Sequence, residues 1–183
     1  MNGPESGALL DQFIGRAVSL GAVVEKVPDL KSASSFIADF CAQKEIKKIV
    51  GSPGALAWFG KNISFFNPAQ VKDYDQAQAG VVVADYGIAE TGTLVHLLSS
   101  DSEKLAGVLP RICLAVLESI KIVAKPEAIA DVITAHLSRA AQPGPQVAFV
   151  SGPSRTADIE CQLSLGVHGP ASLIILIVDE APQ

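Results

Sequence analysis

Short apolar runs alternate with amphipathic stretches along most of the chain. Runs rich in aliphatic and aromatic residues predict strands at 22–27, 48–50, 63–66, 80–84, 93–98, 112–117, 147–150 and 173–178. Apolar residues at helical spacing predict helices at 9–20, 32–43, 55–59, 127–140 and 156–163. Strands that are aliphatic on both sides need cover on both faces. The pattern therefore favours an α/β fold, a mostly parallel sheet flanked by helices.

The length of the chain is that of one ordinary domain. Its 183 residues show no repeat and no break in composition, so we expect a single α/β domain over residues 1–183. A hydrophobic content of 49% and a charged content of 18% exclude a disordered chain. The longest aliphatic run, at 173–178, is far too short to span a membrane, and no basic residue precedes Arg16 as a secretory signal would require.

The net charge and the cysteine content indicate which classes of partner and which cellular compartment to expect. A net charge of -5, with Lys and Arg mostly scattered, argues against nucleic acid. Cys41, Cys113 and Cys161 lie far apart, which is typical of reduced thiols in a cytoplasmic protein. Their spacing also excludes a cysteine-ligated iron–sulfur cluster or zinc site within the chain. No G-x-G-x-x-G follows a strand, so no dinucleotide fingerprint is present.

The first segment with candidate chemistry follows the predicted strand at 147–150. Gly152 lets a ligand approach the backbone closely, and the next helix is expected to begin nearby, with Arg155 beside its free N–H groups. This arrangement predicts an anion site; a capped strand-to-helix turn with no ligand is the alternative. The candidate anion-binding residues, including those of the turn below, are Thr91, Gly92, Thr93, Ser151, Gly152, Ser154, Arg155 and Thr156.

Two further segments carry candidate catalytic residues. Glu90 lies on a glycine-containing turn, where a carboxylate could act as base or nucleophile; the alternative is turn chemistry alone, with Gly92 supplying a positive φ. His168 lies between glycines in a loop, so it is either exposed to solvent or part of a site. His96 and His136 border apolar stripes and are interpreted as structural, and a three-histidine metal site is not expected.

Three phrases together resemble a known family. They are Gly87 to Thr93 (GIAETGT), Ser151 to Glu160 (SGPSRTADIE) and Gly166 to Pro170 (GVHGP). Their order and separation are similar to those of the LUD domain family, to which lactate-utilisation protein C belongs, and the likeness runs from about residue 79 to 178. The resemblance implies a Rossmann-like fold similar to CoA transferases, ribose-5-phosphate isomerase and glucosamine-6-phosphate isomerase. It also implies a role in oxidising L-lactate to pyruvate beside iron–sulfur partner proteins, with no cofactor in this chain.

Three functions are compatible with these observations. The chain could be an accessory subunit of a lactate-oxidising complex that binds a small carboxylate or phosphate. It could be a transferase or isomerase in its own right, because Glu90-Thr91-Gly92 is similar to the E-x-G nucleophile of CoA transferases. It could also be a regulatory or scaffolding module without catalysis. The sequence leaves the ligand, the partner and a homo-oligomeric state open.

Overall fold

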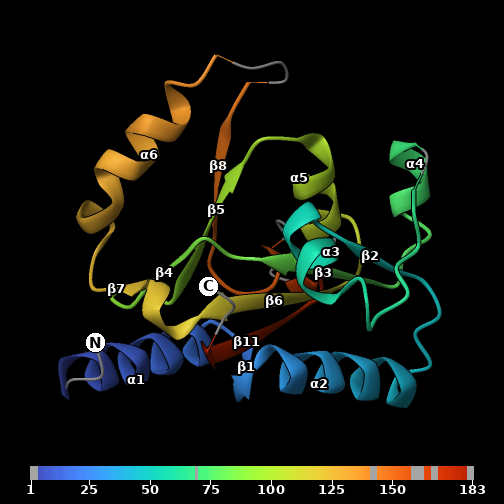
Figure 1. Ribbon diagram of the computed structural model, residues 1–183, viewed down its shortest axis with the longest axis horizontal. Helices are drawn as coiled ribbons and strands as arrows, with labels where there is room; N and C mark the ends of the chain where they lie inside the picture. Colours follow the sequence, from blue (N-terminus) through green and yellow to red (C-terminus); the bar gives the residue numbers. More distant parts are fainter. Residues whose placement is uncertain (1–3, 69, 141–143, 158–162, 166–168, 181–183) are drawn as a thin grey trace.

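Two β-sheets form the framework of the computed structural model, which describes residues 4–68, 70–140, 144–157, 163–165 and 169–180 (Figure 1). The large sheet is entirely parallel, in the order β1-β11-β6-β3-β2. Its strands are β1 (Val23–Asp29), β11 (Ser172–Glu180), β6 (Ile112–Glu118), β3 (Ala79–Val83) and β2 (Ile49–Gly51). The predicted parallel sheet is therefore confirmed, with β6 at its centre and β11 between β6 and the edge strand β1.

The large sheet is covered on both faces. One face packs on α2 (Leu30–Gln43) and α3 (Pro53–Phe59), and the other on α1 (Pro4–Ser19), α5 (Asp101–Val108) and part of the small sheet. Alternate residues of β6 and β11 enter these two cores, which is why both strands are apolar throughout. Figure 1 shows α1 and α2 running along one side of the molecule.

The small sheet has the order β7-β4-β5-β8. Its strands are β7 (Ile122–Val123), β4 (Tyr86–Ile88), β5 (Thr93–Leu98) and β8 (Gln146–Val150); β5 is antiparallel to both neighbours. The face turned from the large sheet is covered by η2 (Pro126–Ile129) and α6 (Ala130–Leu137). The predicted strand at 147–150 is confirmed, but it is an edge strand whose Phe149 is 54% exposed, not a buried one.

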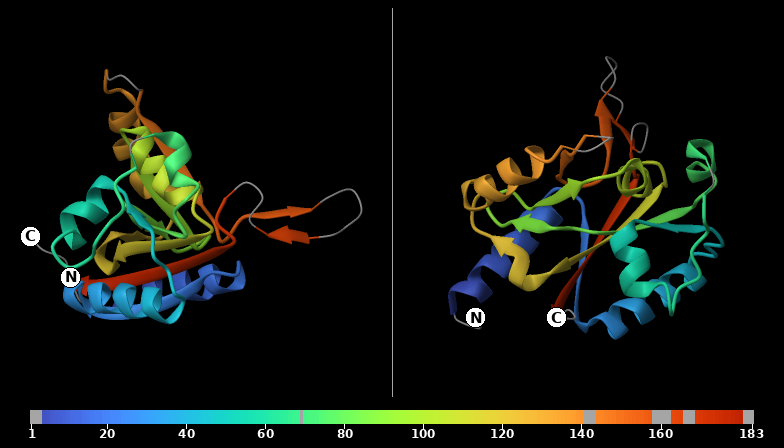
Figure 2. Two further views of the ribbon diagram at one scale, coloured as in Figure 1. Left: turned by 90° about the vertical axis from the view of Figure 1, so that its right-hand side faces the viewer. Right: turned by 45° about the horizontal axis from the view of Figure 1, so that its top comes forward.

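The helix predicted at 156–163 is wrong at residues 156, 157 and 163, and residues 158–162 lie outside the described part of the chain. The described residues belong to β9 (Arg155–Ala157) and β10 (Leu163–Leu165), which form an antiparallel pair. Figure 2 shows this pair projecting away from the rest of the molecule. A segment this short satisfies helical and alternating spacing equally well, and the pairing of β9 with β10 decides between them.

Other boundaries also differ from the prediction. The expected strand at 63–66 is irregular, and its main tie to the sheet is the Phe66 N–H, which donates to the Ile49 carbonyl at 2.7 Å. In the helix predicted at 127–140, α6 ends at Leu137, and the inward face includes Ile129 and Ile133 but not Val132 or Leu137, which are 38% and 50% exposed. The sequence Gln142-Pro143-Gly144-Pro145 predicts a turn, which lies partly outside the described residues.

Several short elements were not predicted. They are α4 (Val71–Tyr74), α5, β4, η1 (Ser119–Lys121) and β7. Of these, α5 matters most for the site. It begins with a capping box, in which Ser100 and Glu103 each bond the other's backbone N–H. It also lies very close to β3, because a Cβ at Gly80 would come within 1.8 Å of the Ala106 carbonyl oxygen. Among the described helices, none is both long and apolar enough to cross a membrane.

Candidate functional site

A chain of three hydroxyl groups joins two segments singled out in the sequence. The Thr91 and Thr93 hydroxyl oxygens lie 2.7 Å apart, and the Thr93 hydroxyl lies 2.7 Å from that of Ser151. The contact follows from the register of the small sheet, in which Leu94 pairs with Val150, so that Thr93 and Ser151 are the next residues along. Thr93 is buried, whereas Thr91 and Ser151 are exposed. We call these three residues the hydroxyl chain.

Two glycines beside the hydroxyl chain, Gly92 and Gly152, allow the end of α1 to pack closely against the backbone. Gly92 and Gly152 have positive φ angles of 67° and 85°. A Cβ at Gly92 would lie 2.4 Å from the Ala17 nitrogen, and one at Gly152 would lie 2.7 Å from the Leu20 carbonyl oxygen. Helix α1 therefore occupies the space that the missing Cβ atoms leave, and the close approach at Gly152 is made by this helix.

Arg155 lies on β9 and is exposed. Its guanidinium sits over Gly21, where a Cβ would come within 2.1 Å of Nη2. Gly21 follows the C-terminal end of α1, where the helix dipole favours a positive charge. Because no helix begins after Gly152, the expected free N–H groups of a helix start are absent from residues 153–157. Thr156 lies in β9, opposite Ser164.

The other sequence-predicted residues are spread around this region. The Ser154 N–H donates to the Pro170 carbonyl at 2.8 Å, which joins the phrase that begins at Ser151 to the end of the phrase Gly166 to Pro170. Glu90 is exposed on the turn between β4 and β5, and its N–H donates to the Ala124 carbonyl at 3.1 Å. The Gly92 N–H closes that turn on the Ile88 carbonyl at 2.8 Å. His168 lies outside the described residues.

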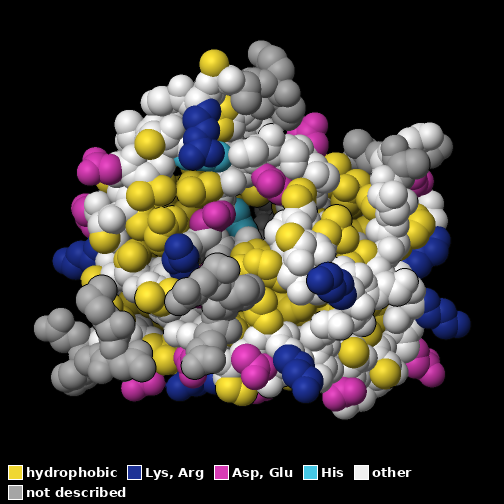
Figure 3. All heavy atoms as spheres, viewed as in Figure 1, with side chains coloured by type: hydrophobic (Ala, Val, Ile, Leu, Met, Phe, Trp, Pro, Cys, Tyr) yellow, Lys and Arg dark blue, Asp and Glu magenta, His cyan; other side chains and the backbone are white. Residues whose placement is uncertain are grey.

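A cavity opens between the two sheets beside α5, and we call it the inter-sheet cavity. It has two adjoining lobes, with about 510 Å³ and 480 Å³ of empty space open to solvent. The lobes share four lining residues: Val82, His96, Leu98 and Glu103. Figure 3 shows a hollow on this face with histidine and acidic side chains at it and hydrophobic side chains around it.

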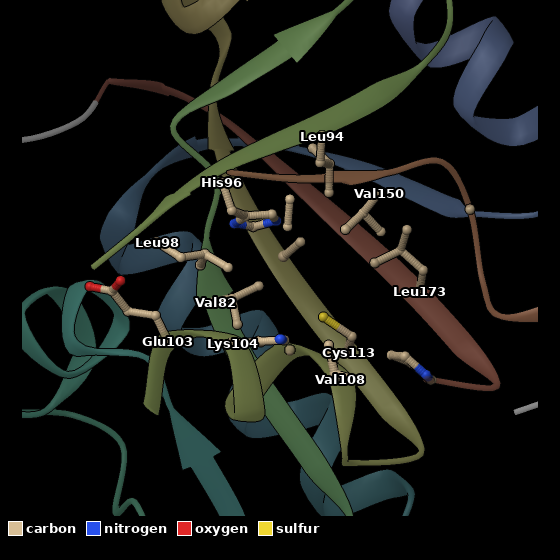
Figure 4. Close-up of a pocket in the computed structure, with 15 residues that line it drawn as sticks. Val82, Leu94, His96, Leu98, Glu103, Lys104, Val108, Cys113, Val150 and Leu173 are labelled. Atoms are coloured by element: carbon tan, nitrogen blue, oxygen red, sulfur yellow. The ribbon is translucent and has the colours of Figure 1, made fainter. Parts of the chain in front are cut away.

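The two lobes differ in chemistry. The apolar lobe is lined largely by aliphatic side chains of β3, β5, β6, β8, β11 and α5; they include Val82, Leu94, Leu98, Val108, Val150 and Leu173 (Figure 4). The polar lobe is lined by Ser52 and Asp85 in addition to His96 and Glu103. Ser52 and Asp85 follow β2 and β3, so the polar lobe lies at the carboxyl ends of parallel strands, where ligands of α/β sheets bind.

Burial tunes the ionisable groups of the polar lobe. His96 is only 8% exposed, and its Nδ1 lies 3.2 Å from the Val83 carbonyl oxygen. Burial lowers the pKa of His96. Asp85 as a residue is exposed, but the partial desolvation of its carboxyl group raises its pKa. The Asp85 Oδ2 accepts from the Leu97 N–H at 2.7 Å. Glu103 Oε2 accepts from the Ser100 N–H at 3.2 Å and also from the Ser99 N–H.

Sequence reasoning missed this cavity. His96 was expected to be structural, and its hydrogen bond and burial agree with that, but it also lines both lobes. His136 is structural as expected: its Nε2 lies 3.1 Å from both the Leu98 and the Gln146 carbonyl oxygens. Asp85 directly follows a predicted strand, and the S-x-x-E spacing from Ser100 to Glu103 marks a helix start. Those two signals could have identified the polar lobe.

The described residues do not hold a metal centre or an activated thiol. No group of three or more His, Cys, Asp or Glu side chains among them could bind a metal ion. Cys41 and Cys113 are buried and unpaired. Burial raises the pKa of Cys113 to about 12, so this thiol stays protonated at neutral pH and is a poor nucleophile.

Comparisons with known proteins agree with this fold. Lactate utilization protein C of Bacillus pumilus (strain SAFR-032) is 36% identical over 110 residues, which are 58% of this chain and 44% of that protein. The Escherichia coli (strain K12) protein called uncharacterized protein YkgG is 32% identical over 127 residues, 65% of this chain and 53% of its own. The chain thus spans about half the length of the curated relatives it matches.

A solved structure and a family model complete the comparison. The crystal structure of a DUF162 family protein from Deinococcus radiodurans superposes with a TM-score of 0.69 at 19% identity, covering 94% of this chain and 98% of that one, and so shares the fold. The model of the LUD domain matches residues 54–178, which include the hydroxyl chain and most of the inter-sheet cavity. The chain therefore belongs to the LUD domain family.

Proposed function

We propose that this chain is an accessory subunit in the oxidation of L-lactate to pyruvate, acting beside partner proteins that carry iron–sulfur clusters. The observation that carries the proposal is the LUD match over residues 54–178 together with relatives called lactate utilization protein C. Membership of the family supports a role in lactate utilisation, and the partners and the ligand are the finer part of the proposal.

The chemistry of the reaction explains why partners are needed. Conversion of L-lactate to pyruvate releases two electrons and two protons, and an electron acceptor must take them. The three cysteines of this sequence do not have the spacing of cluster ligands, and no dinucleotide fingerprint is present. Electron transfer is therefore assigned to the iron–sulfur partners, and this chain binds an anion or the partners themselves.

The hydroxyl chain and Arg155 are the proposed anion site. Three hydroxyl groups carry three protons, and the two bonds within the chain use two of them. One O–H is left to donate outward to a carboxylate or phosphate. Arg155, exposed on β9, has no hydrogen-bond acceptor among the described residues and can hold an anion with two parallel bonds. The candidates Gly92, Gly152 and Ser154 would supply backbone or hydroxyl contacts, and Thr156 follows Arg155 on β9.

Reconstitution tests this function. The chain is purified without oxygen and assayed for lactate-dependent dye reduction, alone and with iron–sulfur proteins that co-purify with it from its source. We expect no oxidation by the chain alone and a rate with the partners that falls when the chain is omitted. A partner complex that oxidises lactate equally well without this chain would refute the proposal, as would lactate oxidation by the chain alone.

A further inference from the structure

We propose that the inter-sheet cavity is a second binding site, for an uncharged or cationic molecule with an apolar body and a hydroxyl or amine at one end, and that Nε2 of His96 accepts the hydrogen bond from that end. The site adjoins the proposed anion site, because Gly152 lines the apolar lobe, but it is distinct from it, because no residue of the hydroxyl chain lines either lobe. Neither the family nor the relatives' names assign a ligand to these residues.

The hydrogen bond of His96 decides which of its ring nitrogens carries the proton. A backbone carbonyl can only accept a hydrogen bond, so the Nδ1 that contacts the Val83 carbonyl must carry the proton. In the neutral ring, Nε2 then holds a free lone pair. Burial keeps the ring neutral at pH 7 because it lowers the pKa of His96.

The lone pair on Nε2 of His96 points toward accessible space. No described residue makes a hydrogen bond to Nε2 of His96. Yet, within the described part of the chain, every side-chain nitrogen or oxygen that is fully buried has a hydrogen-bond partner. Nε2 is therefore in contact with accessible space, although the residue is only 8% exposed. Figure 4 shows the ring pointing from β5 into the space beside Val82 and Cys113.

The polar lobe is acidic, because Asp85 and Glu103 line it. Asp85 and Glu103 each bind backbone N–H groups through one oxygen, Oδ2 and Oε2, and their other oxygens have no donor among the described residues. Together with Nε2 of His96, they offer acceptors for hydrogen bonds. The lining cation, Lys104, belongs to the apolar lobe, and its ammonium lies 3.4 Å from Gln146 Oε1. Such a lobe attracts donors and repels a carboxylate.

The apolar lobe can hold the apolar body of a ligand. Its aliphatic walls suit an apolar group, and its space of about 60 Å³ for the centres of water-sized spheres limits that group to a single ring or a short branched chain. Cys113 at this wall is a neutral thiol and behaves as a small apolar group. A ligand that filled both lobes would place its apolar body between the sheets and its donor against His96.

Three probes with the same ring test the proposal. Benzyl alcohol and benzylamine carry donors, whereas benzoate carries a carboxylate. Each is titrated into the ¹⁵N-labelled protein, and the histidine ring nitrogens are followed by NMR through their long-range coupling to the ring protons. We expect a saturable shift of the His96 Nε2 resonance with benzyl alcohol and benzylamine and none with benzoate.

The chain contains its own control for this experiment. The Nε2 of His136 faces two carbonyls, so this ring must have the opposite tautomer, with the proton on Nε2. Its resonances should not move with any probe. A His96→Asn variant assigns the signals. Equal shifts of both rings, a shift with benzoate as large as with benzylamine, or no shift with any probe would overturn the proposal.

A filled cavity gives a second test that does not alter His96. Ala148 lines the apolar lobe from β8, and Ala148→Phe should occupy the lobe and weaken benzylamine binding at least about tenfold. Phe149→Leu, at the next position on β8, faces the other side of the sheet and should leave binding unchanged. Unchanged binding in a folded Ala148→Phe variant would place the probe elsewhere. Neither result depends on lactate oxidation, so failure here leaves the proposed function standing.

Discussion

Thr93 and Ser151 share a hydrogen bond of 2.7 Å although 58 residues separate them in the chain. Each belongs to a different phrase of the family signature, and the neighbouring glycines of both phrases receive the last turn of α1. The two phrases thus form one structural unit that holds β5, β8 and α1 together. The glycines of both phrases are explained by packing, which leaves the hydroxyl groups and Arg155 as the parts of this unit that face outward.

Thr93→Val should destabilise the fold by about 1–2 kcal/mol, because it removes the hydroxyl that makes both bonds of the chain while keeping the shape of the side chain. Thr91→Val removes only one bond, from an exposed residue, and should cost less. Urea unfolding followed by circular dichroism measures both values. Equal stability of Thr93→Val and the parent would mean that the hydroxyl chain contributes nothing to the fold.

Gly152→Ala should destabilise the protein by at least about 2 kcal/mol, because φ is +85° and the added Cβ would meet the Leu20 carbonyl. Gly15→Ala is the matched control. Gly15 is an exposed residue of α1 with nothing within 4 Å of its added Cβ, so alanine should stabilise the helix by roughly 0.5–1 kcal/mol. Thermal unfolding should move the two variants in opposite directions. A tolerated Gly152→Ala would contradict the close seat of α1.

Arg155→Lys should reduce the effect of an anion without altering the free protein. A ligand at a hundred times its Kd raises stability by about 2.7 kcal/mol, which is a rise in Tm of roughly 5–10 °C for a domain of this size. Lactate, pyruvate and phosphate are screened by thermal shift. Lysine cannot reproduce the paired bonds of the guanidinium, so most of the rise should disappear. If the variant responds like the parent, the anion binds elsewhere.

Asp85→Asn should stabilise the protein at pH 7. Desolvation of the carboxyl group raises the pKa of Asp85 in the folded protein above its ordinary value of 3.8, so between the unfolded and the folded pKa the folded state binds more protons than the unfolded state. Stability from this group therefore rises as the pH falls through that window, and the ionised form is unfavourable above it. Asparagine keeps an oxygen for the Leu97 N–H. Its advantage at pH 7 should vanish below about pH 4, and a constant difference across this range would rule out the charge as its cause.

Glu90 should not form a covalent adduct with an acyl-CoA. It is exposed on its turn and lines neither lobe of the inter-sheet cavity, so nothing among the described residues excludes water from an intermediate. Intact mass spectrometry after incubation with acetyl-CoA and hydroxylamine or borohydride is the measurement. An adduct that is present in the parent and lost in Glu90→Gln would instead support a transferase.

Local patterns predict all five strands of the large sheet and also β5 and β8 of the small sheet, because apolar runs and their flanking turns are local signals. They do not predict that β5 and β8 belong to a second sheet. That β5 and β8 leave the parallel sheet and pair with each other depends on contacts between distant residues. The same reason hides the cavity: His96 has the alternation of an ordinary strand residue, and only α5 and β8, supplied by other parts of the chain, enclose it.

The position of β11 has a consequence for synthesis on the ribosome. This strand separates β1 from β6, and Val23 of β1 pairs with Ile174 of β11. Until residues 172–180 have left the exit tunnel, β1 has no neighbouring strand in the sheet, and the edge of β6 that pairs with β11 has no hydrogen-bonding partner. Unpaired edges of this kind invite association with other chains. Nascent polypeptides that end before β11 should therefore need chaperones, and sheet closure should follow completion of that strand as a slow step dominated by long-range contacts.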